Sequence, residues 1–275
     1  MAGILVAAAL AAAMPAAAPV QPIAPPAVAN ADPAIFVVRD DDTTVYIFGT
    51  FHALDGRAEW FNDQVKEAFE KSDELVLETL VPERPSRLPA GATPLQQIRI
   101  VAPSASFLAS TRMAINAGKT QGMQVSNGAD MVLRRAAEDE GKSVQGLETL
   151  ESQLAMFNRL SQQAAAPAAA PAGPAARAPM PAAKGLSESM ADMQSAWKRG
   201  DQSVFVRILG QLERGSPDTY RMMFTERNAR WADWIRARMQ TPGTVFVAVG
   251  AGHLAGKDSV LVQLAERGIY SSRVN

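Results

Sequence analysis

Short apolar runs alternate with longer amphipathic stretches along most of this chain. Four runs have the length and apolar content of buried strands: 35–38 (IFVV), 45–48 (VYIF), 74–79 (ELVLET) and 245–249 (VFVAV). The first two flank the polar sequence DDDTT and predict a strand, a turn and a second strand. Residues 142–149 and 269–274 predict two further strands.

Helical periodicity fills the intervals between these runs. Residues 58–71 place Phe61, Val65 and Phe69 four positions apart, which gives a helix with one buried face. Further helices are predicted at 95–127, at 130–140 with Asp130 as N-cap and Gly141 as stop, at 187–239 with breaks near 200–201 and 215–217, and at 258–267. Strands separated by helices require crossover connections. The predicted fold is therefore α/β, with a central, largely parallel sheet flanked by helices and a helical middle region.

The N-terminal segment has the pattern of an export signal. Residues 3–18 are apolar but too short and too interrupted by Pro for a stable membrane span, and they resemble the apolar region of a secretory signal peptide. The sequence Ala-Asn-Ala at 29–31 fits a cleavage site, so we expect an exported, periplasmic protein whose mature form begins at Asp32. No Lys or Arg precedes Arg39, and the alternative is a disordered tail over 1–31.

A second segment dominated by Ala and Pro predicts a flexible insertion at 162–186 and not a packed element. Because a histidine motif lies on each side of it, residues 32–275 are predicted to form one domain that contains this insertion as a loop.

Composition excludes several classes of function. The chain has 275 residues, with 27 Lys and Arg against 28 Asp and Glu. This balance gives no basic surface for nucleic acid, so nucleic-acid binding is not expected. The absence of Cys excludes disulfides, thiolate zinc sites and a cysteine nucleophile. Only two His are present, so any histidine chemistry must use one or both.

Both histidines close the same short motif at the end of a predicted strand. The motif Gly-x-x-His occurs as GTFH at 49–52 and as GAGH at 250–253, and two other strands end in Leu-Glu-Thr at 77–79 and 147–149. In open α/β sheets, ligands bind outside the carboxyl ends of the strands. If these strands are parallel, one edge of the sheet gathers four polar side chains: His52, Glu78, Glu148 and His253.

Two imidazoles and a carboxylate are a good ligand set for a divalent transition metal. His52 and His253, with one or both of Glu78 and Glu148, could hold such an ion, with Mn, Co, Zn or Fe all chemically suitable. Such a site activates water, and Glu78 or Glu148 would act as the general base. Without a metal, a His–Glu pair would still perform acid–base chemistry. The alternative is that each His caps a loop and each Glu is a carboxylate at a strand exit.

One further candidate lies on the helix near residues 222–239. Its buried face is marked by Phe224, Trp231, Trp234 and Ile235. Arg227 and Asn228 share this face by helical spacing. Arg227 either orients an anionic group of the substrate or forms a salt bridge, to Glu226 or to a carboxylate across the core.

These motifs together resemble the TraB/GumN family, which is similar to the Tiki proteins. The family has an early GT-x-H motif, a Glu ending a following strand and a late G-x-GH-L-x-G motif. Here they correspond to GTFHALD at 49–55, LVLET at 75–79 and VAVGAGHLAGKDSVLVQLAERGI at 247–269. Weaker matches are GAD at 128–130, VQGLET at 144–149, WKRGD at 197–201 and ERN at 226–228.

The resemblance implies an erythromycin-esterase/ChaN-like α/β fold and a metal-dependent hydrolase of the peptidase type. It assigns His52, Glu78 and His253 to the metal or catalytic set and Arg227 to the site. The expected substrate is a peptide or a small molecule. The alternative is a periplasmic protein that binds a peptide, haem or a metal without turnover, because family membership alone does not fix an activity.

Overall fold

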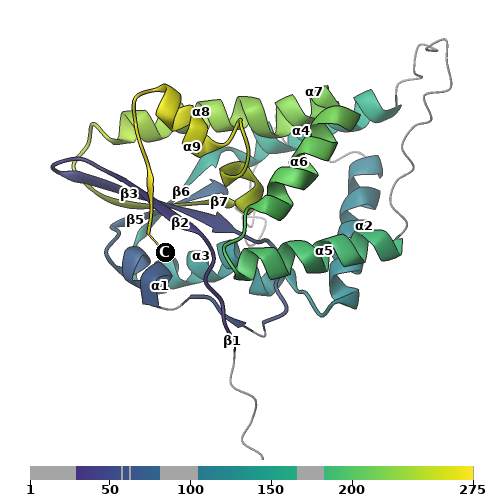
Figure 1. The fold of residues 1–275 in the computed structure, drawn as a ribbon, viewed down its shortest axis with the longest axis horizontal. Helices are drawn as coiled ribbons and strands as arrows, with labels where there is room; N and C mark the ends of the chain where they lie inside the picture. The colour runs from purple at the N-terminus through teal and green to yellow at the C-terminus, as the bar shows by residue number, and fades with distance from the viewer. Residues whose placement is uncertain (1–28, 57, 62, 81–104, 166–182, 275) are drawn as a thin grey trace, which may run out of the picture.

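The computed structural model describes residues 29–56, 58–61, 63–80, 105–165 and 183–274 (Figure 1). Almost all of the predicted signal segment therefore lies outside the described residues, as does the centre of the predicted insertion. The two ends of that insertion, 162–165 and 183–186, are helical.

A six-stranded sheet with the order β6-β5-β7-β3-β2-β8 forms the centre of the molecule. Four adjacent strands run parallel to one another: β3 (Thr43–Thr50), β5 (Glu74–Thr79), β6 (Ser143–Glu148) and β7 (Gly243–Gly250). The strands β2 (Ile35–Arg39) and β8 (Ser272–Arg273) complete one edge in antiparallel pairing. The predicted α/β class with a largely parallel sheet is confirmed.

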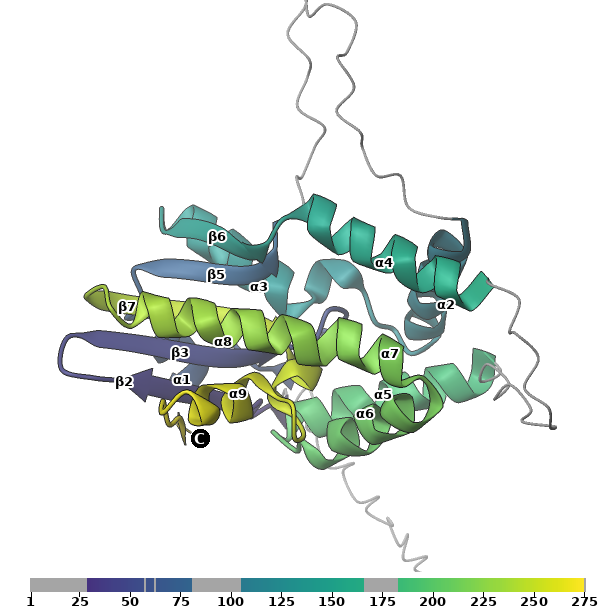
Figure 2. The ribbon, with the colours of Figure 1, turned by 90° about the horizontal axis from the view of Figure 1, so that it is seen from above.

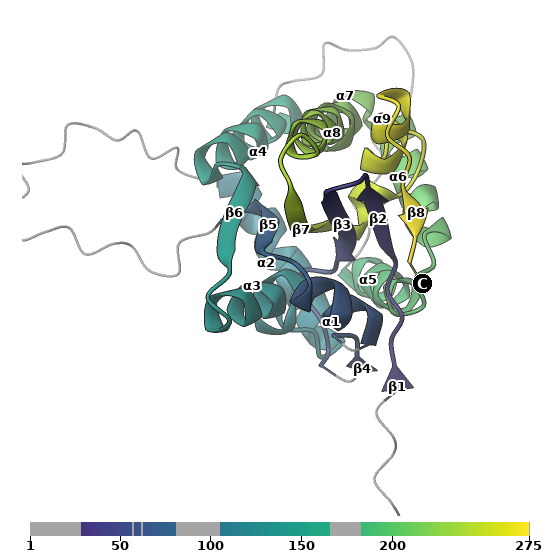
Figure 3. The same cartoon turned by 90° about the vertical axis from the view of Figure 1, so that its left-hand side faces the viewer.

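Helices cover both faces of this sheet, which explains why its strands are apolar on both sides (Figure 3). One face packs against α8 (Glu226–Arg238) and α9 (Val260–Glu266), through residues such as Ile47, Val76 and Val247. The other packs against α1 (Asp63–Glu70) and α3 (Ala129–Asp139), through residues such as Phe48, Leu75 and Phe246. The Trp residues predicted to be core, Trp60, Trp197 and Trp231, are all buried.

A helical region lies beyond the carboxyl ends of the parallel strands (Figure 2). It consists of α2 (Ala105–Thr120), α4 (Leu150–Ala165), α5 (Ala183–Lys198), α6 (Ser203–Gly215) and α7 (Pro217–Tyr220). The predicted breaks are present: Gly200 has a φ of 62°, and Ser216 separates α6 from α7. A π-helical turn, Arg221–Thr225, joins α7 directly to α8.

Several predicted boundaries were wrong. The helix predicted from residue 58 begins at Asp63, because Ala58–Glu59 instead form a short strand, β4, that pairs with β1 (Ala29–Asn30). Asp130 does not cap α3: Gly128 precedes the helix, and Asp130 lies in its first turn. By contrast, the region 95–127 was predicted to be mostly helical with loops, and its described part, from residue 105, agrees: α2 is followed by a short loop and a 3-10 turn at Val125–Asn127. The last predicted strand shortens to Ser272–Arg273.

Candidate functional site

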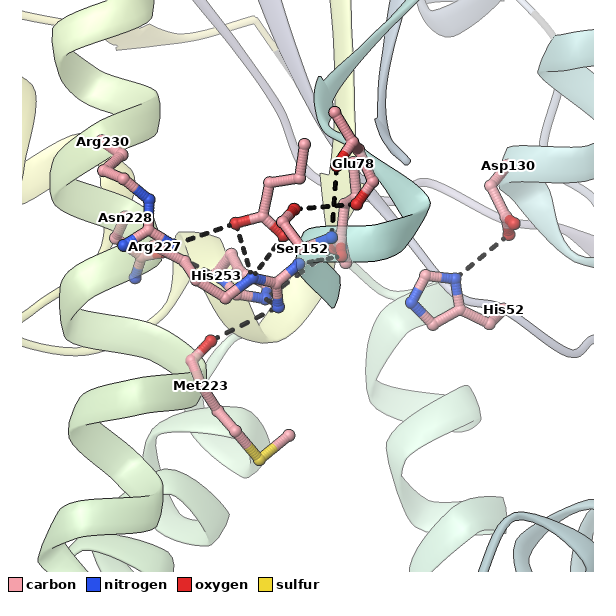
Figure 4. A network of polar contacts seen from close by, with 12 residues as sticks. His52, Glu78, Asp130, Ser152, Met223, Arg227, Asn228, Arg230 and His253 are labelled. Atoms are coloured by element: carbon pink, nitrogen blue, oxygen red, sulfur yellow. Dashed lines mark hydrogen bonds and ion pairs between the residues drawn. The ribbon is translucent and has the colours of Figure 1, made fainter. Parts of the chain in front are cut away.

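The carboxyl ends of the parallel strands bring the two histidine motifs together. Thr50 at the end of β3 is in register with Gly250 at the end of β7, so the GTFH and GAGH motifs leave the sheet side by side. Because β5 pairs with the other side of β7, Glu78 reaches the same edge, and Glu148 follows on β6. The predicted convergence is confirmed (Figure 4).

His253 is buried and held rigidly. Its ring lies between Phe224 and Trp231, with centroid distances of 4.8 and 4.5 Å. Its Nδ1 lies 2.6 Å from Oδ1 of Asn228. The Nδ2 of Asn228 donates to the carbonyl of Asp258, at 2.7 Å, so Oδ1 is the free acceptor of this amide. The network therefore assigns the proton of His253 to Nδ1 and leaves a lone pair on Nε2.

Arg227 occupies the space in front of that lone pair. Its Nη1 lies 3.2 Å from Nε2 of His253, and its Nη2 donates to Glu78 Oε2 at 2.8 Å. Its Nε donates to both oxygens of Glu148, at 3.1 and 3.0 Å, and the guanidinium stacks on Trp231 at 4.6 Å. Arg227 thus forms the salt bridge across the core that was one of its two predicted roles, and Glu226, the other suggested partner, pairs with Arg221.

Glu78 joins Arg227 to the backbone of the second histidine motif. Its Oε1 accepts from the N–H of Gly250 at 2.6 Å and lies 3.8 Å from Nε2 of His253. Burial alone would raise the pKa of Glu78, but the basic groups around it, His253 and Arg227 foremost, and the Gly250 N–H outweigh burial and lower the pKa to about 2. Glu78 is therefore ionised at neutral pH.

Burial has the opposite consequence for His253. Removal from water disfavours the imidazolium, and the charge of Arg227 adds to this, while the charge of Glu78 opposes it. The net effect lowers the pKa of His253 to about 3, in agreement with a neutral ring whose Nε2 accepts from Arg227.

Glu148 lies behind Arg227 and not at the cavity side of it. Its side chain is 8% exposed and also accepts from Arg230, whose Nη2 is 3.2 Å away and which is itself 60% exposed. Glu148 lines a separate cavity of ≈ 420 Å³ together with Arg230. This placement suits a residue that fixes and neutralises Arg227.

His52 has a more open environment than His253. Its side chain is 61% exposed, and its Nδ1 lies 3.3 Å from Oδ1 of Asp130. The surrounding protein disfavours the charged ring, but the hydrogen bond to Asp130 and the charge of Glu78 outweigh this and raise the pKa of His52. Water screens these charges at an exposed ring and so weakens their effect on its pKa.

The partner of His52 was not predicted from the sequence. Asp130 reaches His52 because the N–H of Ala129 donates to the carbonyl of Phe51 at 3.0 Å, which docks the start of α3 on the end of β3. A Cβ at Gly128 would meet the carbonyl oxygen of His52 at 2.3 Å, so only Gly permits this approach. The available signal was the GAD motif, in which Gly128 stands two residues before Asp130.

A second weak motif, WKRGD, also contacts the first histidine motif. Trp197 donates from Nε1 to the carbonyl of Gly49 at 2.7 Å, and Lys198 pairs with Asp55 at 2.9 Å. The WKRGD sequence on α5 therefore fixes both ends of the GTFHALD segment.

Gly250 keeps a small space open between the candidate ligands. A Cβ at this position would lie 3.1 Å from Glu78 Oε1, 3.3 Å from His52 Nε2 and 3.7 Å from His253 Cδ2. The absence of a side chain thus leaves one point that all three groups surround. The same edge opens into a cavity of ≈ 630 Å³ whose polar end contains His52, Glu78, Arg227 and His253.

The donor chemistry of this point fits a divalent transition metal. Each imidazole is held at Nδ1 by an oxygen acceptor, the arrangement that orients metal-ligating histidines and leaves Nε2 for the ion. In their present positions, no three His, Asp or Glu side chains within the described part of the chain are close enough together to hold an ion. Binding therefore requires Arg227 to release Nε2 of His253 and the three groups to draw together.

Comparisons with known proteins identify the family. The model of the TraB/PrgY/gumN family matches residues 34–104 and 86–273, which together include both histidine motifs. A search of curated proteins and a search of solved structures return no match. Within the residues that the structure describes, no helix has the length and apolar character needed to cross a membrane.

Proposed function

The chain belongs to the TraB/PrgY/gumN family, and we propose that it is a metal-dependent hydrolase that cleaves amide bonds of peptide substrates. One observation carries the proposal: both imidazoles are held at Nδ1, by Asp130 and Asn228, so that both Nε2 atoms lie near Glu78 in one cavity, where a metal ion would replace Arg227 at Nε2 of His253. Fixing two imidazoles and a carboxylate around one point has no evident use in packing alone.

His52, His253 and Glu78 would hold the ion. When bound, a divalent ion of Mn, Co, Zn or Fe supplies Lewis acidity, which polarises a carbonyl and makes water more acidic. The buried groups favour a cation here, because two carboxylates, Glu78 and Glu148, share one buried guanidinium, Arg227.

The chain's own groups perform the remaining tasks. Asp130 and Asn228 fix the tautomer and orientation of the two rings. Once Arg227 has released His253, Nη1 of Arg227 would be free to donate to the carbonyl oxygen of a substrate in the cavity as that oxygen gains negative charge. Glu148 keeps Arg227 in place for that role, so we assign Glu148 to positioning and not to proton transfer.

Metal content and turnover test the proposal. We would load the full chain separately with Mn, Co, Zn and Fe, quantify bound metal by mass spectrometry, and assay a peptide library with the metal retained. His52→Ala is the informative variant, since an exposed ring can be removed with little loss of stability, and Asp233→Asn, on the exposed face of α8, is the matched control.

We expect metal near one equivalent and peptide cleavage in the wild type and in Asp233→Asn, and neither in His52→Ala. Peptide binding without cleavage would instead support the binding protein that the sequence left as an alternative. A wild type that retains no metal after loading would overturn the metal assignment.

We further propose that residues 1–31 direct export to the periplasm. The pattern of 3–18 supports this. Ala29 and Asn30 pair with β4 and Ala31 is buried, so cleavage before Asp32 would remove three residues that the structure uses. Cell fractionation, with the mass of the recovered chain, tests both export and the cleavage position. Intact chain confined to the cytoplasm would contradict the proposal.

A further inference from the structure

Two buried hydroxyl groups at the site have no hydrogen-bond partner within the described part of the chain. They belong to Thr50 at the end of β3 and Thr79 at the end of β5. Thr50 is 2% exposed, so its hydroxyl is shut off from bulk water. A buried polar group without a partner costs free energy, and native proteins contain few of them. Two such groups beside one site therefore call for an explanation.

The sheet places the two threonines on either side of Gly250. Thr50 is directly in register with Gly250 on the neighbouring strand β7. On the other side, Leu77 is in register with Ala248, which places Thr79 in the row of Gly250. Residues in one row of a parallel sheet point to the same face. The row is therefore Thr–Gly–Thr across three strand ends, with the open space of Gly250 between the two hydroxyls.

All three residues of this row line the ≈ 630 Å³ cavity. Away from the row and the charged groups, its walls are apolar and rich in the adaptable side chains of Met: Phe51, Met131, Met190, Met193, Met223 and Phe224. A ligand that fits must present apolar side chains to the walls and hydrogen-bonding groups to the floor. A peptide with apolar side chains does both, because its backbone amides accept from and donate to hydroxyls.

We propose that the hydroxyls of Thr50 and Thr79 are substrate-binding groups that hydrogen-bond the backbone amides of an apolar peptide lying across Gly250. This rests on the proposed function, because it assigns the substrate to the same site. It explains why the hydroxyls lack partners in the free protein: their partners arrive with the ligand. Binding specificity of this type leaves polar groups unpaired until the correct ligand supplies the missing half of each bond.

The proposal predicts opposite changes in stability and in binding for one substitution. Thr50→Val keeps the shape of the side chain and removes only the hydroxyl. Because no bond is lost in the free protein, the Tm should stay the same or rise by about 2 °C. Because one bond to the ligand is lost, KM should rise about fivefold. Thr79→Val should behave in the same way, and Thr50→Ser, which retains a hydroxyl, should restore KM.

The same strand provides a matched control. Thr43 begins β3 as Thr50 ends it, and it is also 2% exposed. Its hydroxyl, however, bonds to the carbonyl of Thr241 at 3.1 Å and to Asp42 at 3.0 Å. Thr43→Val should therefore lower the Tm by about 3 °C and leave KM unchanged.

The experiment uses the full-length chain, thermal unfolding, and a Leu-rich decapeptide with acetylated and amidated ends. Cleavage gives KM, and fluorescence anisotropy of a labelled copy gives Kd independently of turnover. A Thr50→Val protein that loses Tm as Thr43→Val does and keeps wild-type KM and Kd overturns the inference. Binding without cleavage, weakened by Thr50→Val, sustains it while overturning the hydrolase proposal. A wild type that neither binds nor cleaves the peptide overturns both.

Discussion

The two Gly-x-x-His motifs end neighbouring parallel strands, offset by one residue so that Thr50 is opposite Gly250, and their histidines have opposite environments. His253 is 5% exposed, packed against two aromatic rings and held by an amide. His52 is 61% exposed and held by a carboxylate on a helix that docks from the other face. The motif therefore fixes where each ring lies, and the helices that pack on it decide whether the ring is a buried acceptor or an exposed, protonatable group.

The buried groups around His253 depend on Arg227, so removing Arg227 should lower the free energy of unfolding most. Arg227→Met leaves Glu78 and Glu148 buried without their shared partner, which should lower the free energy of unfolding by about 3–5 kcal/mol. Arg230→Met, on the same helix but 60% exposed, should cost less than about 1 kcal/mol. Urea unfolding of both variants measures the difference. Equal, small losses would contradict a buried ion network.

Replacing each histidine tests the comparison directly. His253→Ala removes a stacked ring and leaves Asn228 Oδ1 without its donor, so it should cost about 2–4 kcal/mol. His52→Ala should cost less than about 1 kcal/mol, since its ring is mostly exposed. Both should abolish turnover. Urea unfolding beside a peptide-cleavage assay separates the two readouts, and equal stability losses would mean that burial does not distinguish the motifs.

The pH dependence of stability should have opposite signs for the two rings. His253 is neutral in the fold down to about pH 3 but protonated in the unfolded chain below about 6.5, so its contribution to stability rises with pH in that window. His52 has a raised pKa, so it favours the fold below about pH 6.5, and that contribution is lost as pH rises through its folded pKa.

Thermal unfolding from pH 4.5 to 9.5 checks these signs. Between pH 4.5 and 6.5, above the range where Glu78 titrates, His253→Gln should flatten the rise of Tm. Above pH 6.5, Asp130→Asn should flatten the fall, which will be the smaller slope because solvent screens the exposed pair. Slopes unchanged in both variants would mean that neither ring is linked to folding.

The smallest change in stability is expected at the point between the two rings. Gly250→Ala should cost about 1 kcal/mol or less, because its Cβ would meet side-chain atoms at 3.1–3.3 Å that can shift slightly. It should nevertheless weaken metal binding about tenfold by occupying the space that the ligands surround. Metal titration followed by calorimetry measures this. Unchanged affinity would place the ion elsewhere.

The sequence predicts the convergence of the site better than its details. The apolar runs of β3, β5 and β7 are continuous because both faces of the sheet are covered, and parallel strands connected by helices must share one carboxyl edge. These rules are sufficient to predict that His52, Glu78 and His253 lie close together. Arg227 follows from helical spacing, since a buried guanidinium requires a carboxylate.

The partners that differ between the rings could not be predicted in this way. Asp130 lies 78 residues from His52, and an Asp at the start of a helix is locally indistinguishable from an N-cap. Its role depends on how α3 docks on Phe51, which is a tertiary contact. The unpartnered hydroxyls of Thr50 and Thr79 are likewise invisible in a sequence, because every Thr carries the same group and only the fold decides which ones lack a bond.

The order of the strands has a consequence for folding of the chain during its synthesis. β7, which carries the second histidine motif, is the penultimate strand in the sequence but lies between β3 and β5 in the sheet. A chain emerging from a ribosome or a membrane channel holds two incomplete half-sheets with open edges until residues 243–250 arrive. Insertion of this one strand closes the sheet and delivers His253 in the same event. Folding of the domain and assembly of its candidate site are therefore a single step, and a chain that ends before β7 lacks the site.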